Sequence, residues 1–132
     1  MADAQTPAPV ADDFDVFARN CPSRPALEHI TGRWGLLVLA ALSELGVARF
    51  GEVRRKIDGI SEKMLSQTLH TLERDGFAHR TVIAAMPPHV EYRLTPLGAE
   101  TAVRLLDLIE HLHHAMPAIL AAQDQYDAAQ GG

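Results

Sequence analysis

Apolar residues recur at helical spacing along most of the chain, and the points where this spacing stops mark the predicted elements. A first helix is expected at about residues 22–31, with Cys21 as its N-cap and Gly32 after its end. Residues 34–45 are apolar almost all round, which is typical of a central buried helix. Trp34 adjoins this helix and is predicted to pack in the core rather than to stack on a nucleic-acid base.

Two helices joined by a tight turn are predicted in the middle of the chain. The first is short and lies within residues 51–59. The second begins after its N-cap, Ser61, and ends before Gly76. Its predicted buried stripe consists of three leucines at helical spacing, Leu65, Leu69 and Leu72. Together the two helices are a helix-turn-helix candidate.

A hairpin is expected directly after this pair of helices. Residues 77–83 and 90–94 are suited to β-strands, and two prolines turn the chain at residues 86–89. Thr95 followed by Pro96 then marks the start of another helix, because threonine is a good N-cap and proline fits the first helical position. The hairpin would stand beside the helix-turn-helix as a wing.

The helix that starts at Pro96 is predicted to continue to about Ala115. Pro117 is expected to kink it or to start another amphipathic segment, since proline removes a backbone hydrogen bond inside a helix. At the other end of the chain, residues 1–13 show no apolar period and are predicted to form a flexible tail.

Composition and charge narrow the class of protein. The chain has 132 residues, 47% of them hydrophobic, one cysteine and a formal net charge of -5. A single cysteine excludes a disulfide framework within the chain, and no apolar run is long enough to span a membrane, so a cytoplasmic protein is expected. Residues 49–93 hold eight Lys and Arg against six Asp and Glu, a net charge of +2, whereas the rest of the chain carries -7. A basic middle with acidic flanks is compatible with DNA binding.

Four stretches, in this order along the chain, carry a resemblance to a known family: CPSRPALEHITGRW, RFGEVRR, IDGISEKMLSQTLHTLERDGF and PPHVEYRLTPLG. They resemble the HxlR branch of the MarR-like winged-helix transcriptional regulators. The resemblance implies an α+β, mostly α fold, a winged helix-turn-helix with flanking dimerisation helices. It also implies a homodimeric DNA-binding repressor or activator. No cofactor is predicted.

The elements and the resemblance together divide the chain. Residues 14–128 are expected to form one winged helix-turn-helix domain whose DNA-binding core lies at about residues 34–95. Helices at about residues 22–31 and 96–128 are expected to form the dimer, since the C-terminal apolar stripe offers more surface than a core of this size covers. A two-fold dimer would present its recognition helices to a pseudo-palindromic operator about 34 Å apart.

The predicted DNA contacts centre on the second helix of the pair. Its face opposite the leucine stripe is polar, so Ser66 and Gln67 are expected to hydrogen-bond base edges, and Lys63 and Arg74 to bind phosphates. The full predicted set comprises this face, the basic residues before the turn, the N-cap and the wing: Arg54, Arg55, Lys56, Ser61, Lys63, Ser66, Gln67, His70, Arg74, Arg80, His89 and Arg93.

Cys21 is the candidate for a regulatory site. At the start of a helix, with Arg19 and Arg24 close in sequence, its thiolate would be favoured and would react with oxidants or electrophiles. Several members of the family that the chain resembles sense oxidants or quinones through a cysteine at this position. An oxidant, a quinone or another small molecule is therefore the expected effector. The alternative is an inert cysteine that packs at the dimer interface.

The residues also bear on functions other than DNA binding. A winged helix that binds another protein, with the basic middle only solvated, is the principal alternative. No P-loop, dinucleotide-binding motif, nucleophile elbow or paired-carboxylate spacing occurs, so an enzyme is not expected. His111, His113 and His114 lie together in sequence, but helical spacing divides them between faces, and no metal site is predicted.

Overall fold

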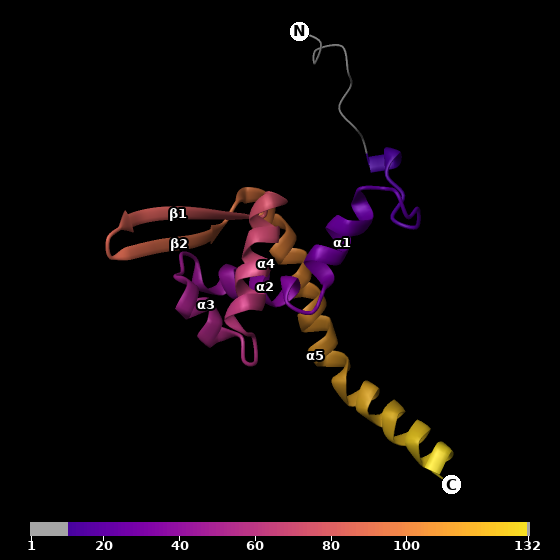
Figure 1. Ribbon diagram of the computed structural model, residues 1–132. Helices are drawn as coiled ribbons and strands as arrows, with labels where there is room; N and C mark the ends of the chain where they lie inside the picture. Colours follow the sequence, from indigo (N-terminus) through magenta and orange to yellow (C-terminus); the bar gives the residue numbers. More distant parts are fainter. Residues whose placement is uncertain (1–10, 132) are drawn as a thin grey trace.

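The computed structural model describes residues 11–131, which form the mostly helical α+β winged helix-turn-helix that the residue pattern predicts (Figure 1). One turn of 3-10 helix at Ala11–Asp13 precedes the first α-helix. The elements that follow, in chain order, are α1 (Ser23–Thr31), α2 (Gly35–Leu45), α3 (Phe50–Lys56), α4 (Glu62–Arg74), β1 (Ala78–Ala85), β2 (Pro88–Leu94) and α5 (Pro96–Gly131). Of the tail predicted at residues 1–13, residues 1–10 lie outside the described part.

The core forms around α2, which packs against α1, α3, α4, α5 and β2. Neighbours on several sides explain why the sequence of α2 is apolar almost all round. The largest fully buried side chains come from α2, α3 and α4 and are Val38, Leu39, Leu42, Val53, Leu65, Leu69 and Leu72. The predicted leucine stripe of α4 is therefore confirmed as buried. Trp34 is half-buried and packs against this core, as predicted.

The turn between α3 and α4 matches the predicted helix-turn-helix. Gly59 adopts a positive φ of 89°, which side chains with a Cβ rarely adopt, and Ile60 is buried beside it. The Ser61 side chain accepts a hydrogen bond from the Met64 amide at 3.1 Å, so the predicted N-cap is confirmed. This cap fixes the point at which α4 begins.

The predicted wing is present but longer than expected. β1 and β2 pair antiparallel from Ala78 with Leu94 at the base to Ala85 with Pro88 at the tip. The turn predicted at residues 86–89 is therefore shorter, because backbone pairing continues until only Met86 and Pro87 separate the strands. Figure 1 shows the wing extending to one side of α4, away from α1.

The start of α1 differs from the prediction. Pro22, not Cys21, occupies the N-cap position, and no side chain caps the helix there. Cys21 lies one residue earlier, where its sulfur accepts the amide of Asp15 at 3.2 Å. The predicted N-cap was therefore wrong by one position, because α1 begins at Ser23 and Pro22 is the residue that precedes it.

The last helix also differs from the prediction. Thr95 accepts the amide of Gly98 at 3.0 Å and donates to the Gly76 carbonyl at 2.6 Å, so the predicted helix start is confirmed. The predicted end near Ala115 was wrong, because α5 continues to Gly131, and Pro117 lies inside this helix rather than at the start of another segment. The missing backbone hydrogen bond is offset by good helix formers on both sides, including the alanines and glutamines of the last turns.

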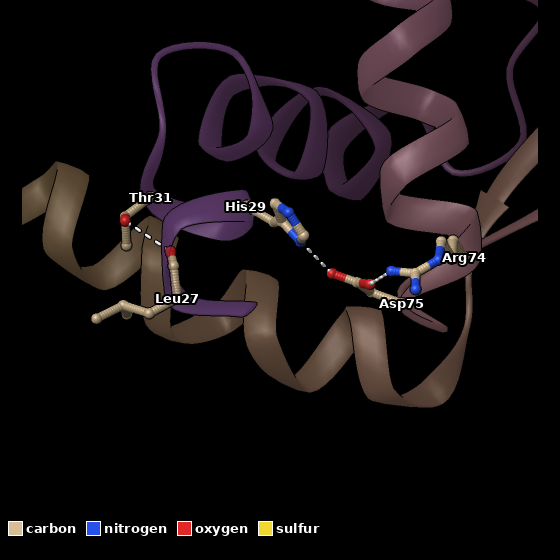
Figure 2. A network of polar contacts seen from close by, with 5 residues as sticks. All are labelled: Leu27, His29, Thr31, Arg74 and Asp75. Carbon is tan, nitrogen blue, oxygen red and sulfur yellow. Dashed lines mark hydrogen bonds and ion pairs between the residues drawn. The ribbon is translucent and has the colours of Figure 1, made fainter. Parts of the chain in front are cut away.

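A polar bridge joins α1 to the end of α4. His29 Nδ1 lies 2.6 Å from Asp75 Oδ2, and Asp75 is the C-cap residue of α4. Arg74 Nη1 lies 3.7 Å from the other carboxylate oxygen. Figure 2 draws both contacts of Asp75 as dashed lines. Within α1, Thr31 donates to the Leu27 carbonyl at 2.7 Å. The bridge holds the C-terminal end of α4 against α1.

Candidate nucleic-acid interface

The outer face of α4 is polar and accessible. Lys63, Gln67, His70 and Arg74 are exposed, and helical geometry places them opposite the buried leucines. Lys63 has no ion-pair partner among residues 11–131, whereas Arg74 lies beside Asp75. The face therefore offers hydrogen-bonding side chains at its centre and a cation near each end.

One flank of α4 adjoins the wing. A groove there is lined by Ser66 and His70 of α4 and by Arg80 and Tyr92 of the two strands. Arg80 and Tyr92 are paired across the strands, so they share one face of the ribbon. Arg93 pairs with His79 on the other face and is not brought together with α4. Of the two predicted wing arginines, the structure thus places Arg80 beside the outer face of α4.

The three basic residues of α3 differ in their surroundings. Arg54 Nη1 lies 3.0 Å from Glu62 of α4, and Lys56 Nζ lies 2.6 Å from Glu44 of α2. Arg55 is exposed and has no ion-pair partner within residues 11–131. Arg54 lies across the turn from the start of α4, so its pair also helps to hold the two helices together. Surface pairs of this kind contribute little stability, and a phosphate can compete for the cation.

The remaining predicted contacts lie at the two ends of this surface. Ser61 caps α4, and accepting that hydrogen bond leaves its hydroxyl able to donate. His89, near the wing tip, has Nε2 at 3.0 Å from Glu91 Oε2. A carboxylate so close to the imidazole weakens any attraction of the wing tip for phosphate.

The corner between α1 and α2 was missed by the predicted contact set. Arg33 Cζ lies 4.7 Å from the centroid of the Trp34 ring and the arginine is exposed. Both residues line a second groove, on the flank of α4 that Gln67 and Thr71 border. In the sequence, the only sign of this site is an arginine next to a tryptophan. The sequence does not show that the corner packs against α4, which places the arginine beside that helix.

Cys21 precedes α1 and is not among the residues of this surface. Its sulfur has two polar neighbours of its own. Its sulfur is 3.2 Å from Ser23 Oγ and 3.2 Å from the amide nitrogen of Asp15. Hydrogen bonds from the Ser23 side chain, the Ser23 backbone and the Asp15 backbone lower the pKa of the Cys21 thiol from its ordinary value. Cys21 is half-buried and forms no disulfide within the chain.

The described part of the chain contains neither a metal-binding cluster nor a membrane-spanning helix. No three His, Cys, Asp or Glu side chains within residues 11–131 are placed to hold a metal ion. His114 lies 3.8 Å from Glu110 on the exposed surface of α5. Over the same residues, no helix has the length and apolar character needed to cross a membrane.

The arrangement of α3, α4 and the wing agrees with known proteins. The model of the HxlR-like helix-turn-helix family matches residues 29–119. The chain belongs to this family. It is 49% identical over 111 residues to YtfH of Escherichia coli, an HTH-type transcriptional regulator, covering 84% of this chain and 87% of YtfH.

Solved structures support the membership and the fold. The structure of YtfH, a transcriptional regulator from Salmonella typhimurium, is 46% identical with a TM-score of 0.79, covering 84% of this chain and 98% of that one. The redox regulator HypR in its reduced form is 32% identical with a TM-score of 0.68, covering 76% and 98%. This HxlR-like protein is therefore an HTH-type transcriptional regulator and not an enzyme. Cys21 lies before the residues that the family model matches.

Proposed function

We propose that this HxlR-like regulator binds a pseudo-palindromic operator as a homodimer, with α4 in the major groove. The observation that carries the proposal is the outer face of α4, where exposed polar and basic side chains lie opposite a buried leucine stripe. The major groove of B-DNA is about 12 Å wide and admits one α-helix. With α4 seated there, Gln67 is the side chain best placed to read base edges.

In this proposal, the cationic side chains around α4 bind the phosphates of the DNA backbone. Lys63 and Arg74 lie on the outer face, Arg55 lies on α3, and Arg80 lies on the wing flank. Such contacts fix the register of a protein on the duplex without carrying sequence information. We assign base discrimination to Gln67 and Ser66, and sequence-independent affinity to the four cations.

The proposed dimer uses the apolar surface of α5. Leu108, Leu112 and Leu120 are about half exposed, and with the partly buried Ile119 they continue the face on which Leu105 is buried. Figure 1 shows this part of α5 projecting beyond the rest of the chain. A second copy of the chain would cover the stripe, and a two-fold axis would pair the two α4 helices with two half-sites.

Salt dependence separates DNA binding from the alternative of a protein-interaction module. Duplexes that the protein enriches from a random-sequence pool would be labelled and titrated by fluorescence anisotropy from about 50 to about 200 mM salt. Binding through several phosphates is expected to weaken by orders of magnitude over this range. Failure to enrich any duplex, or affinity indifferent to salt, would contradict the proposal and favour the interaction module.

We further propose that oxidants or quinones act on operator binding through Cys21. The hydrogen bonds that lower the pKa of its thiol favour the reactive thiolate, and HypR, a similar protein, is a redox regulator. One product is a disulfide between Cys21 of the two protomers, in which two thiols lose two electrons and two protons to the oxidant. That bond requires the two Cα atoms to come within about 7 Å. A mixed disulfide and a sulfenic acid are the other products open to a single cysteine.

The test compares operator binding before and after diamide for the wild type and for Cys21→Ser. Diamide accepts the two electrons and two protons and becomes the corresponding hydrazine. Wild type is expected to release DNA, and the serine variant to retain it, with a cross-linked dimer on a non-reducing gel if the disulfide forms. If wild type keeps its DNA, or both proteins lose it equally, a small-molecule inducer that does not react with Cys21 becomes the better account.

A further inference from the structure

We propose that Arg33 binds a phosphate of the DNA backbone on the flank of α4 opposite the wing. This inference rests on the proposed function, because it takes α4 as the helix in the major groove. It adds a contact from outside the helix-turn-helix and the wing. Arg33 lies in the corner between α1 and α2, in a groove whose other wall is α4.

The two flanks of α4 lie on opposite sides of its outer face. The groove at the wing contains Ser66 and Glu73, and the groove at the corner contains Met64 and Thr71. Helical spacing of about 100° per residue puts these two pairs on either side of Gln67. One exposed arginine belongs to each groove, Arg80 on the wing side and Arg33 on the corner side.

The width of the major groove determines what the two arginines can contact when α4 is bound in it. An α-helix with side chains is about 10–12 Å across, so a helix in a major groove about 12 Å wide has a phosphate backbone close to each flank. Arg80 then faces one strand and Arg33 faces the other. Two arginines that straddle the helix would fix its rotation in the groove as well as its depth.

The surroundings of Arg33 suit an anion. The groove it lines includes no Asp or Glu, and Arg33 has no ion-pair partner among the described residues. Its guanidinium lies over the Trp34 ring, and the half-buried ring packs against the core. Contact with the face of a ring leaves the N–H groups at the edge of the guanidinium available for phosphate oxygens.

The backbone holds this corner in one place. A Cβ on Gly35 would lie 1.8 Å from the His29 carbonyl oxygen, so α1 and α2 approach too closely there for any residue but glycine. His29 is tied in turn to Asp75 at the end of α4. The backbone at Arg33 is therefore positioned relative to α4 before DNA binds, and the contact of its guanidinium with the Trp34 ring reduces the side-chain order that binding has to create.

The test uses Arg33→Gln, which removes the charge and keeps most of the length. Its matched control is Arg104→Gln, which removes the same charge from an exposed arginine on α5 that bonds to the Glu100 carbonyl. Both are titrated by anisotropy with a mixed-sequence duplex and with a duplex enriched from a random pool. Arg33→Gln is expected to weaken both complexes by the same factor, about three- to tenfold at low salt. The slope of log affinity against log salt should become shallower by about 0.9 for each phosphate that the variant no longer neutralises.

Three outcomes are informative. If Arg33→Gln binds as Arg104→Gln does while Lys63→Gln is weakened, the Arg33 contact is wrong and the proposed function stands. If Arg33→Gln changes the preference between the two duplexes, Arg33 reads bases, and the phosphate assignment is also wrong. If Lys63→Gln and Arg33→Gln both bind as wild type, the proposed DNA face of α4 has itself failed. Thermal unfolding of each variant distinguishes weaker DNA binding from a failure to fold.

Discussion

Replacing His29 with alanine is expected to destabilise the protein measurably, because it breaks the bridge between α1 and the end of α4. The His29 and Asp75 side chains are 34% and 15% exposed, and their polar atoms are 2.6 Å apart. After the substitution, the Asp75 carboxylate remains at the C-terminal end of α4, where the helix dipole disfavours a negative charge. Its remaining charged neighbour is Arg74, at 3.7 Å and largely exposed.

The magnitude follows from burial and geometry. A hydrogen bond to a charged group contributes about 1.5–3 kcal/mol when well shielded, and exposed ion pairs contribute about 0–1 kcal/mol. The His29–Asp75 bridge lies between these limits, so the expected decrease in the free energy of unfolding is about 1–2 kcal/mol. For a chain of this length, that decrease corresponds to a Tm lower by about 4–8 °C. Asp75→Asn should cost less than His29→Ala, because an amide keeps a hydrogen-bonding partner for the ring and removes the charge at the helix end.

The assay is thermal and urea unfolding followed by circular dichroism, at one protein concentration because dimerisation would make Tm concentration-dependent. The control is His114→Ala, since His114 is 79% exposed and lies 3.8 Å from Glu110. This control should change stability by less than about 0.5 kcal/mol. A cycle with His29→Ala, Asp75→Ala and the double variant isolates the pair. Equal stability of the His29→Ala and His114→Ala proteins, or a coupling energy near zero, would refute the role given to the bridge.

Three further predictions concern DNA, the thiol and the dimer. Gln67→Ala should reduce discrimination between a selected duplex and a mixed-sequence duplex by about 1–3 kcal/mol, whereas Lys63→Ala should weaken both equally, and identical behaviour of the two variants would contradict the assignment. Because hydrogen bonds from Ser23 lower the pKa of Cys21, Ser23→Ala should raise it and move the pH profile of alkylation by iodoacetamide to higher pH. An unchanged profile would mean that the Ser23 hydroxyl does not stabilise the thiolate. If the proposed dimer forms through α5, Leu112→Glu should give a monomer in light scattering where the wild type gives a dimer, since this half-exposed side chain lies on the apolar stripe of α5.

Elements of this chain that depend on neighbours in sequence could be predicted from the sequence. The start of α4 followed from the Ser61 cap and its leucine stripe, and the start of the last helix followed from Thr95 and Pro96. Each rests on contacts within one turn of helix, where residue type and spacing decide the outcome. The helix end predicted near Ala115 was wrong, because many favourable helical residues around Pro117 offset the penalty of one proline.

Placement of side chains across elements was decided by the tertiary structure. The sequence determined that Arg54, Arg80 and Arg93 are cations near a helix-turn-helix, but not that Arg54 meets Glu62 or that only Arg80 shares a groove with α4. Arg33 lies in one groove with Gln67 because the corner between α1 and α2 packs against α4. These contacts join residues far apart in the chain, so they depend on how the helices pack in three dimensions. Hydrophobic periodicity indicates which face of a helix is buried, but not which side chains of another helix that face will meet.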